Sequence, residues 1–175
     1  MKILKKITLT TALIVGSTYL YSHTSTPVAD TQGIIEKVMN YPIIDSIARC
    51  KKDFGYNDAE MLLLEKELKR YLIMAIIKTE PAESVGMYSK DVDNLWHSFI
   101  LFTREYAQFG KECAGHFIHH APRTEHDTPE TKSESIRKFQ YFLTRYQELF
   151  NEEAHAIWFL DRCEKNQKPT PPLAD

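Results

Sequence analysis

The sequence lacks the signals of a β-sheet protein. No segment alternates apolar and polar residues over the length of a strand, and no Asn-Gly dipeptide marks a hairpin. No internal repeat is present either. These absences predict an all-α fold, and a length of 175 residues suits one compact domain with a short targeting segment.

The chain also lacks an excess of charge of one sign. It has 22 Lys and Arg residues against 24 Asp and Glu residues, for a formal net charge of −2. The two signs are interspersed, so no basic face is available for a phosphate backbone. We therefore expect no nucleic-acid partner.

Cysteine is scarce and widely spaced. Cys50, Cys113 and Cys163 lie too far apart for a zinc-finger motif. If the domain is exported, one disulfide could form and one thiol would be left over, but the sequence does not pair them. Three buried thiols are an equally open alternative.

The N-terminus resembles a targeting signal. Lys2, Lys5 and Lys6 precede an uncharged and mostly apolar run, residues 7–21, which is short for a membrane span. We expect residues 1–22 to be a signal peptide or a membrane anchor and residues 23–33 to be a linker. The domain would then be exported to the periplasm or secreted. Alternatively, it would be anchored in the inner membrane and lie on the outer side.

Apolar residues recur with helical spacing through the remaining chain, which predicts about four or five helices in a domain of residues 34–163. The expected helices cover residues 34–52 (interrupted by Pro42), 59–79, 90–113 and a segment from 133 that breaks near 151. Glu67, Lys69 and Arg70 fall beside or outside the apolar stripe of the second, and Ile136 is expected to point inward in the last. Residues 164–175 are Pro-rich and polar, which predicts a disordered tail.

Groups that can bind a metal or move a proton gather between Ser89 and Pro122. Asp93 and His97 are four residues apart and would share a helix face, while His119 and His120 follow a predicted turn at Gly115. Imidazole and carboxylate ligands suit a divalent transition metal such as Zn. The candidate ligands are Asp93, His97, His119 and His120, and the candidate residues of a surrounding binding pocket are Trp96, Tyr106 and Arg104.

Other interpretations of these residues stay open. Asp93 could simply orient His97 without a metal, and an extended segment would point His119 and His120 in different directions, so that at most one joins His97. An Asp-oriented His could also act in acid–base catalysis, although no nucleophile motif accompanies it. The sequence therefore leaves open whether the protein is an enzyme.

The same segment resembles bacterial members of the glycine-rich-domain-containing-protein-like family. The matching residues are Val92, Asp93, Trp96, His97, Ile100, Leu101, Thr103, Tyr106, Gly115, Phe117, His119, His120 and Pro122. One departure is Gly110, which stands where that family usually has Cys, so a Cys-ligated metal is not implied. The resemblance implies a helical fold and a location for the site, but it supplies no reaction.

These observations lead to three functional hypotheses. The first is an exported or membrane-anchored helical domain whose His/Asp site binds a divalent metal or a small ligand. The second is a non-catalytic module for a protein partner, in which the histidines are structural. The third is a metal-dependent hydrolase. In each, the membrane is a partner only through an uncleaved N-terminal segment.

Overall fold

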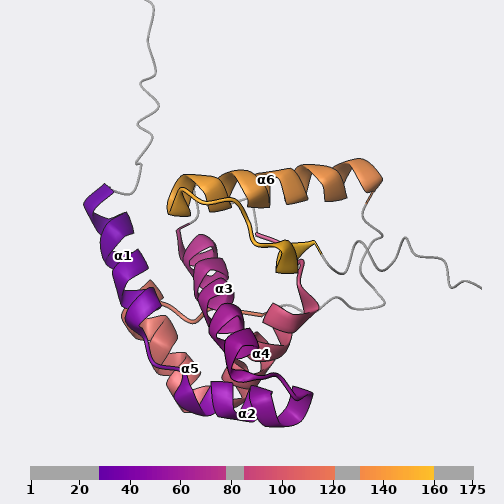
Figure 1. Ribbon diagram of the computed structural model, residues 1–175. Helices are drawn as coiled ribbons and strands as arrows, with labels where there is room; N and C mark the ends of the chain where they lie inside the picture. Colours follow the sequence, from indigo (N-terminus) through magenta and orange to yellow (C-terminus); the bar gives the residue numbers. More distant parts are fainter. Residues whose placement is uncertain (1–27, 78–84, 121–130, 160–175) are drawn as a thin grey trace, which may run out of the picture.

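The computed structural model describes residues 28–77, 85–120 and 131–159. Within these residues the chain forms six α-helices and no strand, so the predicted all-α fold is confirmed (Figure 1). The helices are α1 (Val28–Asn40), α2 (Ile44–Phe54), α3 (Asp58–Ile76), α4 (Lys90–Leu101), α5 (Thr103–Phe109) and α6 (Lys132–Phe150). A π-helical turn, η1 (Gly110–Ala114), follows α5, and a 3₁₀ turn, η2 (Ala156–Trp158), follows α6.

The predicted targeting segment, residues 1–22, and the predicted tail, residues 164–175, lie outside the described residues. Helix α1 begins at Val28, inside the stretch expected to be a linker, so the first helix starts earlier than the expected residue 34. Among the described residues, no helix combines the length and the apolar character that crossing a bilayer requires.

The helix boundaries follow from local capping. The Asn57 side chain accepts a hydrogen bond from the Glu60 backbone N–H, and the Glu60 carboxylate accepts one from the Asn57 backbone N–H, forming a capping box. Ser89 caps α4 by accepting from the Val92 backbone. At the C-terminal end of α6, Asn151 adopts a left-handed conformation with φ 50°. The helix therefore ends where the sequence predicted a break.

Helix α3 is the central element, with α1, α2, α4 and α6 all in contact with it (Figure 1). Residues 67–74 of α3 are consequently all buried. The expectation that Glu67, Lys69 and Arg70 lie beside or outside the apolar stripe is therefore wrong, since these side chains are only 1%, 7% and 7% exposed. Over residues 67–74 the helix is covered on several sides and leaves no solvent face for its charged residues.

The buried charges of α3 are satisfied by the elements packed on it. Glu67 accepts hydrogen bonds from the Tyr146 hydroxyl at 2.9 Å and the Trp158 indole N–H at 2.7 Å. Arg70 donates to the Tyr146 hydroxyl at 2.5 Å and pairs with Glu152 at 2.8 Å. These hydrogen bonds attach α6 and η2 to α3. They also stabilise the fold, because an unpaired buried charge would cost several kcal/mol.

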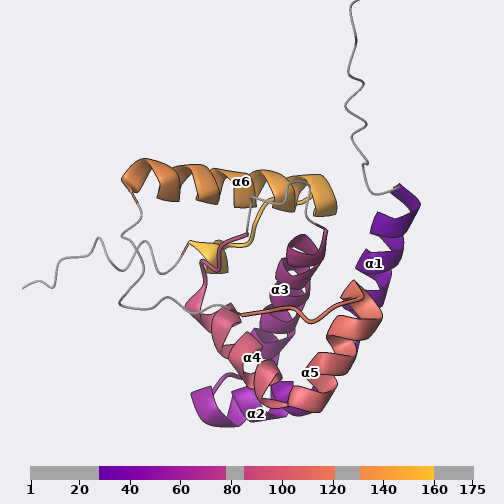
Figure 2. The same cartoon turned by 180° about the vertical axis from the view of Figure 1, so that it is seen from behind.

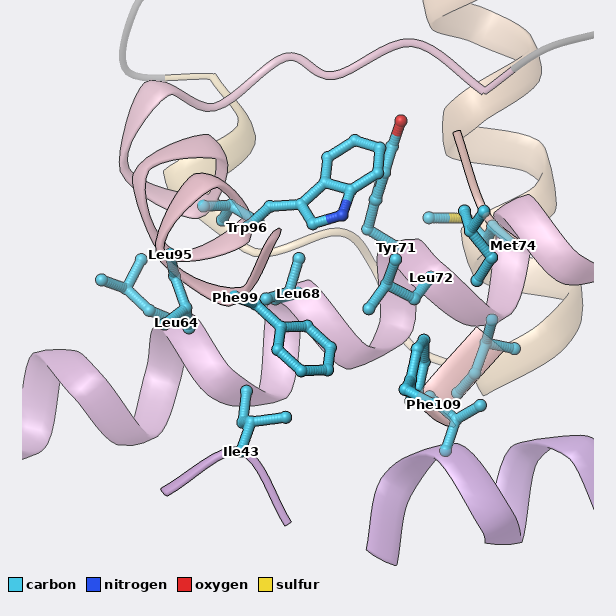
Figure 3. Packing of buried hydrophobic residues seen from close by; sticks show 14 of the residues in the cluster. Ile43, Leu64, Leu68, Tyr71, Leu72, Met74, Leu95, Trp96, Phe99 and Phe109 are labelled. Atoms are coloured by element: carbon cyan, nitrogen blue, oxygen red, sulfur yellow. The ribbon is translucent and has the colours of Figure 1, made fainter. Parts of the chain in front are cut away.

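The apolar core lies between α3 and α4, and α1, α2, α5, α6 and η2 close it; Figure 3 shows part of it. Helix α4 contributes Val92, Leu95, Trp96 and Phe99, all 4% exposed or less. These four residues recur with helical spacing and form the buried face of α4. Ile136 differs from its prediction: it is 45% exposed, because the first turns of α6 extend beyond the helices beneath them (Figure 1).

Candidate metal centre

Helix α4 presents two of the candidate ligands on one flank. Asp93 and His97 are one turn apart, and their side chains are 28% and 52% exposed. Trp96, on the neighbouring face, points into the core and is 4% exposed. The burial of that core face fixes the rotation of the helix and leaves the Asp93–His97 flank accessible.

The helix predicted over residues 90–113 is interrupted, which is a correction to the sequence interpretation. Phe102 leaves the helical conformation with φ −84° and ψ 65°, so α4 ends at Leu101 and α5 begins at Thr103. Arg104 therefore does not continue the flank of Asp93 and His97. It is exposed, and among the described residues no hydrogen bond or ion pair joins it to Asp93.

After α5 the chain reverses and returns to α4. Gly115 has φ +74°, a conformation that glycine adopts without steric cost, and the following residues run back across α3 and α4 (Figure 2). Gly110 permits this return, because a Cβ atom there would lie 2.7 Å from the His116 carbonyl oxygen. The Tyr106 hydroxyl donates to the Ile118 carbonyl at 2.8 Å and holds the returning segment.

The returning segment brings His120 against the other two ligands. His120 Nε2 lies 3.0 Å from Asp93 Oδ1 and 3.2 Å from His97 Nε2. His97 Nε2 lies 3.7 Å from Asp93 Oδ2. One ligand atom from each of the three residues falls within 4.8 Å of the others. We call Asp93, His97 and His120 the His/Asp cluster.

Four acceptor-capable atoms converge in the His/Asp cluster, the two Nε2 nitrogens and the two carboxylate oxygens of Asp93. If His120 Nε2 carries the proton that donates to Asp93, it cannot also accept a proton from His97. If His97 donates to His120 instead, a lone pair of His120 faces the carboxylate of Asp93. One proton therefore cannot satisfy all three close contacts, whereas a cation between them would.

The spacing of these atoms is close to that of zinc ligands. Around a tetrahedral ion with bonds of about 2.0–2.1 Å, ligand atoms lie about 3.3 Å apart. The separations of 3.0 Å from His120 Nε2 to Asp93 Oδ1 and 3.2 Å between the two Nε2 atoms are close to this value. The 3.7 Å separation joins His97 to the second oxygen, Oδ2. Three protein ligands leave a fourth position for water or a bound molecule, as in zinc sites that are not purely structural.

His119 lies outside the cluster. It is exposed, and its ring contacts Phe117 with the ring centroids 5.0 Å apart. In an extended segment neighbouring side chains point to opposite sides, which separates His119 from His120. Of the four predicted ligands, the structure brings three together and leaves this one apart.

Trp96 and Tyr106 lie beneath the cluster as buried supports, with exposed fractions of 4% and 1%. The Trp96 ring packs edge-on against the His120 ring at 4.3 Å. The Trp96 indole N–H donates to the Tyr106 hydroxyl at 3.0 Å. Burial raises the pKa of Tyr106 above its usual value, so the hydroxyl keeps its proton at neutral pH and can donate.

Tyr71 of α3 is a further neighbour of this site, and it was not among the candidate site residues. Its ring packs against Trp96 at 5.1 Å (Figure 3). Burial, together with the negative charge of Asp93, raises the pKa of the Tyr71 hydroxyl. No sequence signal relates Tyr71 to Asp93, because that relationship depends on how α3 packs against α4.

A separate hollow of about 550 Å³ lies between α1 and the α5–η1 segment. Its lining combines charged, amide, aromatic and thiol side chains: Lys37, Asn40, Tyr41, Pro42, Gln108, Glu112 and Cys113. None of these belongs to the His/Asp cluster. Gln108 donates a hydrogen bond to Glu112 at 2.8 Å.

Comparisons with known proteins identify the family of this chain but no biochemical activity. No curated protein and no solved structure matches the chain. Nothing in the family match connects it to the glycine-rich-domain-containing-protein-like family, so that resemblance stays a prediction. The matching family model covers residues 33–167, which include all of the His/Asp cluster, and the chain belongs to the UCP032817-like family.

Proposed function

We propose that this chain binds a divalent transition metal, Zn²⁺ or an ion of similar chemistry, through Asp93, His97 and His120. The observation that carries the proposal is the convergence of two imidazole nitrogens on the Asp93 carboxylate. His120 Nε2 lies 3.0 Å from Oδ1, His97 Nε2 lies 3.7 Å from Oδ2, and the two nitrogens are 3.2 Å apart. Imidazole favours zinc and its neighbours in the transition series, whereas Mg²⁺ and Ca²⁺ prefer oxygen ligands alone.

The position of the cluster suits an ion that exchanges with solvent. His97 is 52% exposed and His120 is 14% exposed, so one ligand faces water while another is backed by Trp96. A fourth coordination position on the open side would take water or a polar group of a small ligand. Such an ion could act as a Lewis acid, which is how the hydrolase hypothesis would be realised.

A second candidate function has its own support. The contact of 3.0 Å between His120 and Asp93 already ties the returning segment to α4 without an ion. In that case the histidines are structural, and the domain serves as a non-catalytic module for a protein partner. A protonated His120 paired with Asp93 would provide the same tie.

Metal titration of the purified full chain separates these functions. After removal of bound metal by a chelator, we expect one Zn²⁺ per chain in competition with a chromophoric chelator. His97→Ala, His120→Ala and Asp93→Asn should each weaken binding by about 10-fold or more, since each removes a ligand. His119→Ala is the matched control, because this neighbouring histidine lies outside the cluster and its loss should leave the affinity unchanged.

The absence of metal uptake by the wild type would contradict the proposal. If the wild type takes up no Zn²⁺, Co²⁺ or Ni²⁺ and its melting temperature is the same with and without chelator, the metal proposal is overturned. Equal affinities of wild type and His120→Ala would also overturn the ligand assignment. The structural-histidine function would then be tested by whether His120→Ala lowers the melting temperature more than His119→Ala.

A further inference from the structure

The Tyr106 hydroxyl connects the two parts of the chain that carry the cluster. It accepts a hydrogen bond from the Trp96 indole N–H at 3.0 Å and donates one to the Ile118 carbonyl at 2.8 Å. Trp96 belongs to α4, which carries Asp93 and His97. Ile118 lies two residues before His120 in the returning segment. The phenol therefore bridges the helix and the segment that must meet.

The direction of both hydrogen bonds is fixed. An indole nitrogen can only donate, and a backbone carbonyl can only accept. The single proton of the Tyr106 hydroxyl must therefore point to Ile118, and its lone pair must face Trp96. Since Tyr106 is 1% exposed, no solvent molecule competes for these bonds, and a buried, fully satisfied arrangement of this kind resists displacement.

The bridge fixes His120 from one side while the core fixes it from another. The Ile118 side chain is 8% exposed and belongs to the apolar core. The His120 ring rests edge-on against Trp96 at 4.3 Å. Trp96 therefore contacts His120 directly and also holds, through Tyr106, the backbone two residues earlier.

We propose that Tyr106 is a positioning residue for the metal centre, holding His120 at ligand distance from Asp93 and His97 through its hydrogen bond to the Ile118 carbonyl. This inference rests on the metal-binding function proposed above. Tyr106 thus lies beneath the site and supports a ligand. A residue of a binding pocket would instead touch the bound molecule.

Tyr106→Phe tests the role, because it removes the hydroxyl and keeps the ring. The ring packs against Phe99, Phe109 and Phe117 at centroid distances of 5.0, 6.4 and 5.3 Å, so the fold should persist. We expect the Zn²⁺ dissociation constant to rise by about 10-fold, as is typical when support around a ligand is removed. The visible spectrum of the Co²⁺-substituted variant should also differ from that of the wild type.

Tyr146→Phe is the matched control for a merely structural effect. The Tyr146 hydroxyl is also buried and bonded, to Glu67 and Arg70, but it lies outside the cluster. This control should lower the melting temperature while leaving the Zn²⁺ dissociation constant unchanged. If both variants weaken binding equally, the effect is general destabilisation and the inference is overturned.

A metal-free measurement separates this inference from the proposed function. Imidazole signals of His120 in NMR spectra of the chelator-treated protein should shift in Tyr106→Phe, because the ring moves relative to Trp96, whereas those of His155 should not. If the wild type binds Zn²⁺ and Tyr106→Phe binds it equally well, the inference fails and the proposed function stands. If the wild type binds no metal, the proposed function fails, and unchanged His120 signals would overturn the positioning role as well.

Discussion

The Nε2 atoms of His97 and His120 lie 3.2 Å apart, although 23 positions separate the two residues in the chain. Neither residue is held there by sequence proximity. The contact depends on a helix end at Leu101, a reversal at Gly115 and the bond between Tyr106 and the Ile118 carbonyl. Changes at these supporting positions should therefore affect the His/Asp cluster without touching a ligand.

Gly110→Ala should disturb the returning segment. Its new methyl group would lie 2.7 Å from the His116 carbonyl oxygen, so the backbone must move, which typically costs about 1–3 kcal/mol. Gly33→Ala is the control, since nothing lies within 4 Å of its Cβ position on α1, and alanine favours a helix over glycine. Urea unfolding should show a loss for the first and no loss for the second. Equal stabilities would contradict the close approach at Gly110.

Trp96→Ala should cost about 3–5 kcal/mol of unfolding free energy, because it removes a large buried ring. The side chain is 4% exposed and packs against Tyr71 and His120. Leu101→Ala on the same helix is the comparison, since Leu101 is 64% exposed and should change stability by less than about 0.5 kcal/mol. A loss below that value for Trp96→Ala would show that Trp96 is not a core residue.

Glu67→Ala should destabilise the protein although it removes a charge from the core. The Tyr146 hydroxyl and the Trp158 indole N–H would both lose their acceptor, and each unsatisfied buried donor costs about 1–3 kcal/mol. Denaturant unfolding of Glu67→Ala can be compared with that of Glu36→Ala, whose glutamate is exposed on α1. A neutral Glu67→Ala would mean that these bonds contribute nothing net.

The Arg70–Glu152 pair should contribute to stability in a defined pH range. The Arg70 guanidinium lowers the pKa of Glu152 from 4.5 to about 2. A lowered pKa in the folded state gives stability that is fully present above pH 4.5 and is lost as the pH falls through about 2. Glu152→Gln should therefore be less stable than the wild type above pH 4.5, and the difference should shrink towards pH 2.

The control for this pH effect is Glu153→Gln, because Glu153 is exposed beside Glu152. Its stability should follow that of the wild type over the same range. A stability difference between Glu152→Gln and the wild type that stays constant from pH 5 to pH 2 would show that the ion pair is not the cause.

We further propose that residues 1–22 direct the domain across a membrane, on the basis of Lys2, Lys5 and Lys6 preceding an apolar run. An alkaline phosphatase fusion placed after Asp175 should be active outside the cytoplasm. Replacing the three lysines by glutamate should reduce that activity. A fusion active only in the cytoplasm would contradict export.

The positions of several helices follow from local sequence signals. Helical periodicity and the interruption at Pro42 predicted α2, α3 and α6 close to where they form, because helix pitch and proline chemistry act within a few residues. The earlier start of α1 at Val28 and the break at Phe102 were not predicted. The i, i+4 pair of Asp93 and His97 was evident for the same reason, since it depends only on the pitch of one helix.

Which residues of different helices meet depends on how the helices pack against one another. From the sequence, Glu67 and Arg70 were expected beside or outside the apolar stripe of their helix. In the structure α6 and η2 cover α3. The partners of the two charges come from these elements and the residues after α6: Tyr146, Trp158 and Glu152. The choice of His120 over His119 likewise depends on the direction of the returning segment, which Gly110 and Tyr106 set through contacts with its backbone. Such contacts join residues distant in the chain, so they are decided by packing in three dimensions, which local periodicity does not encode.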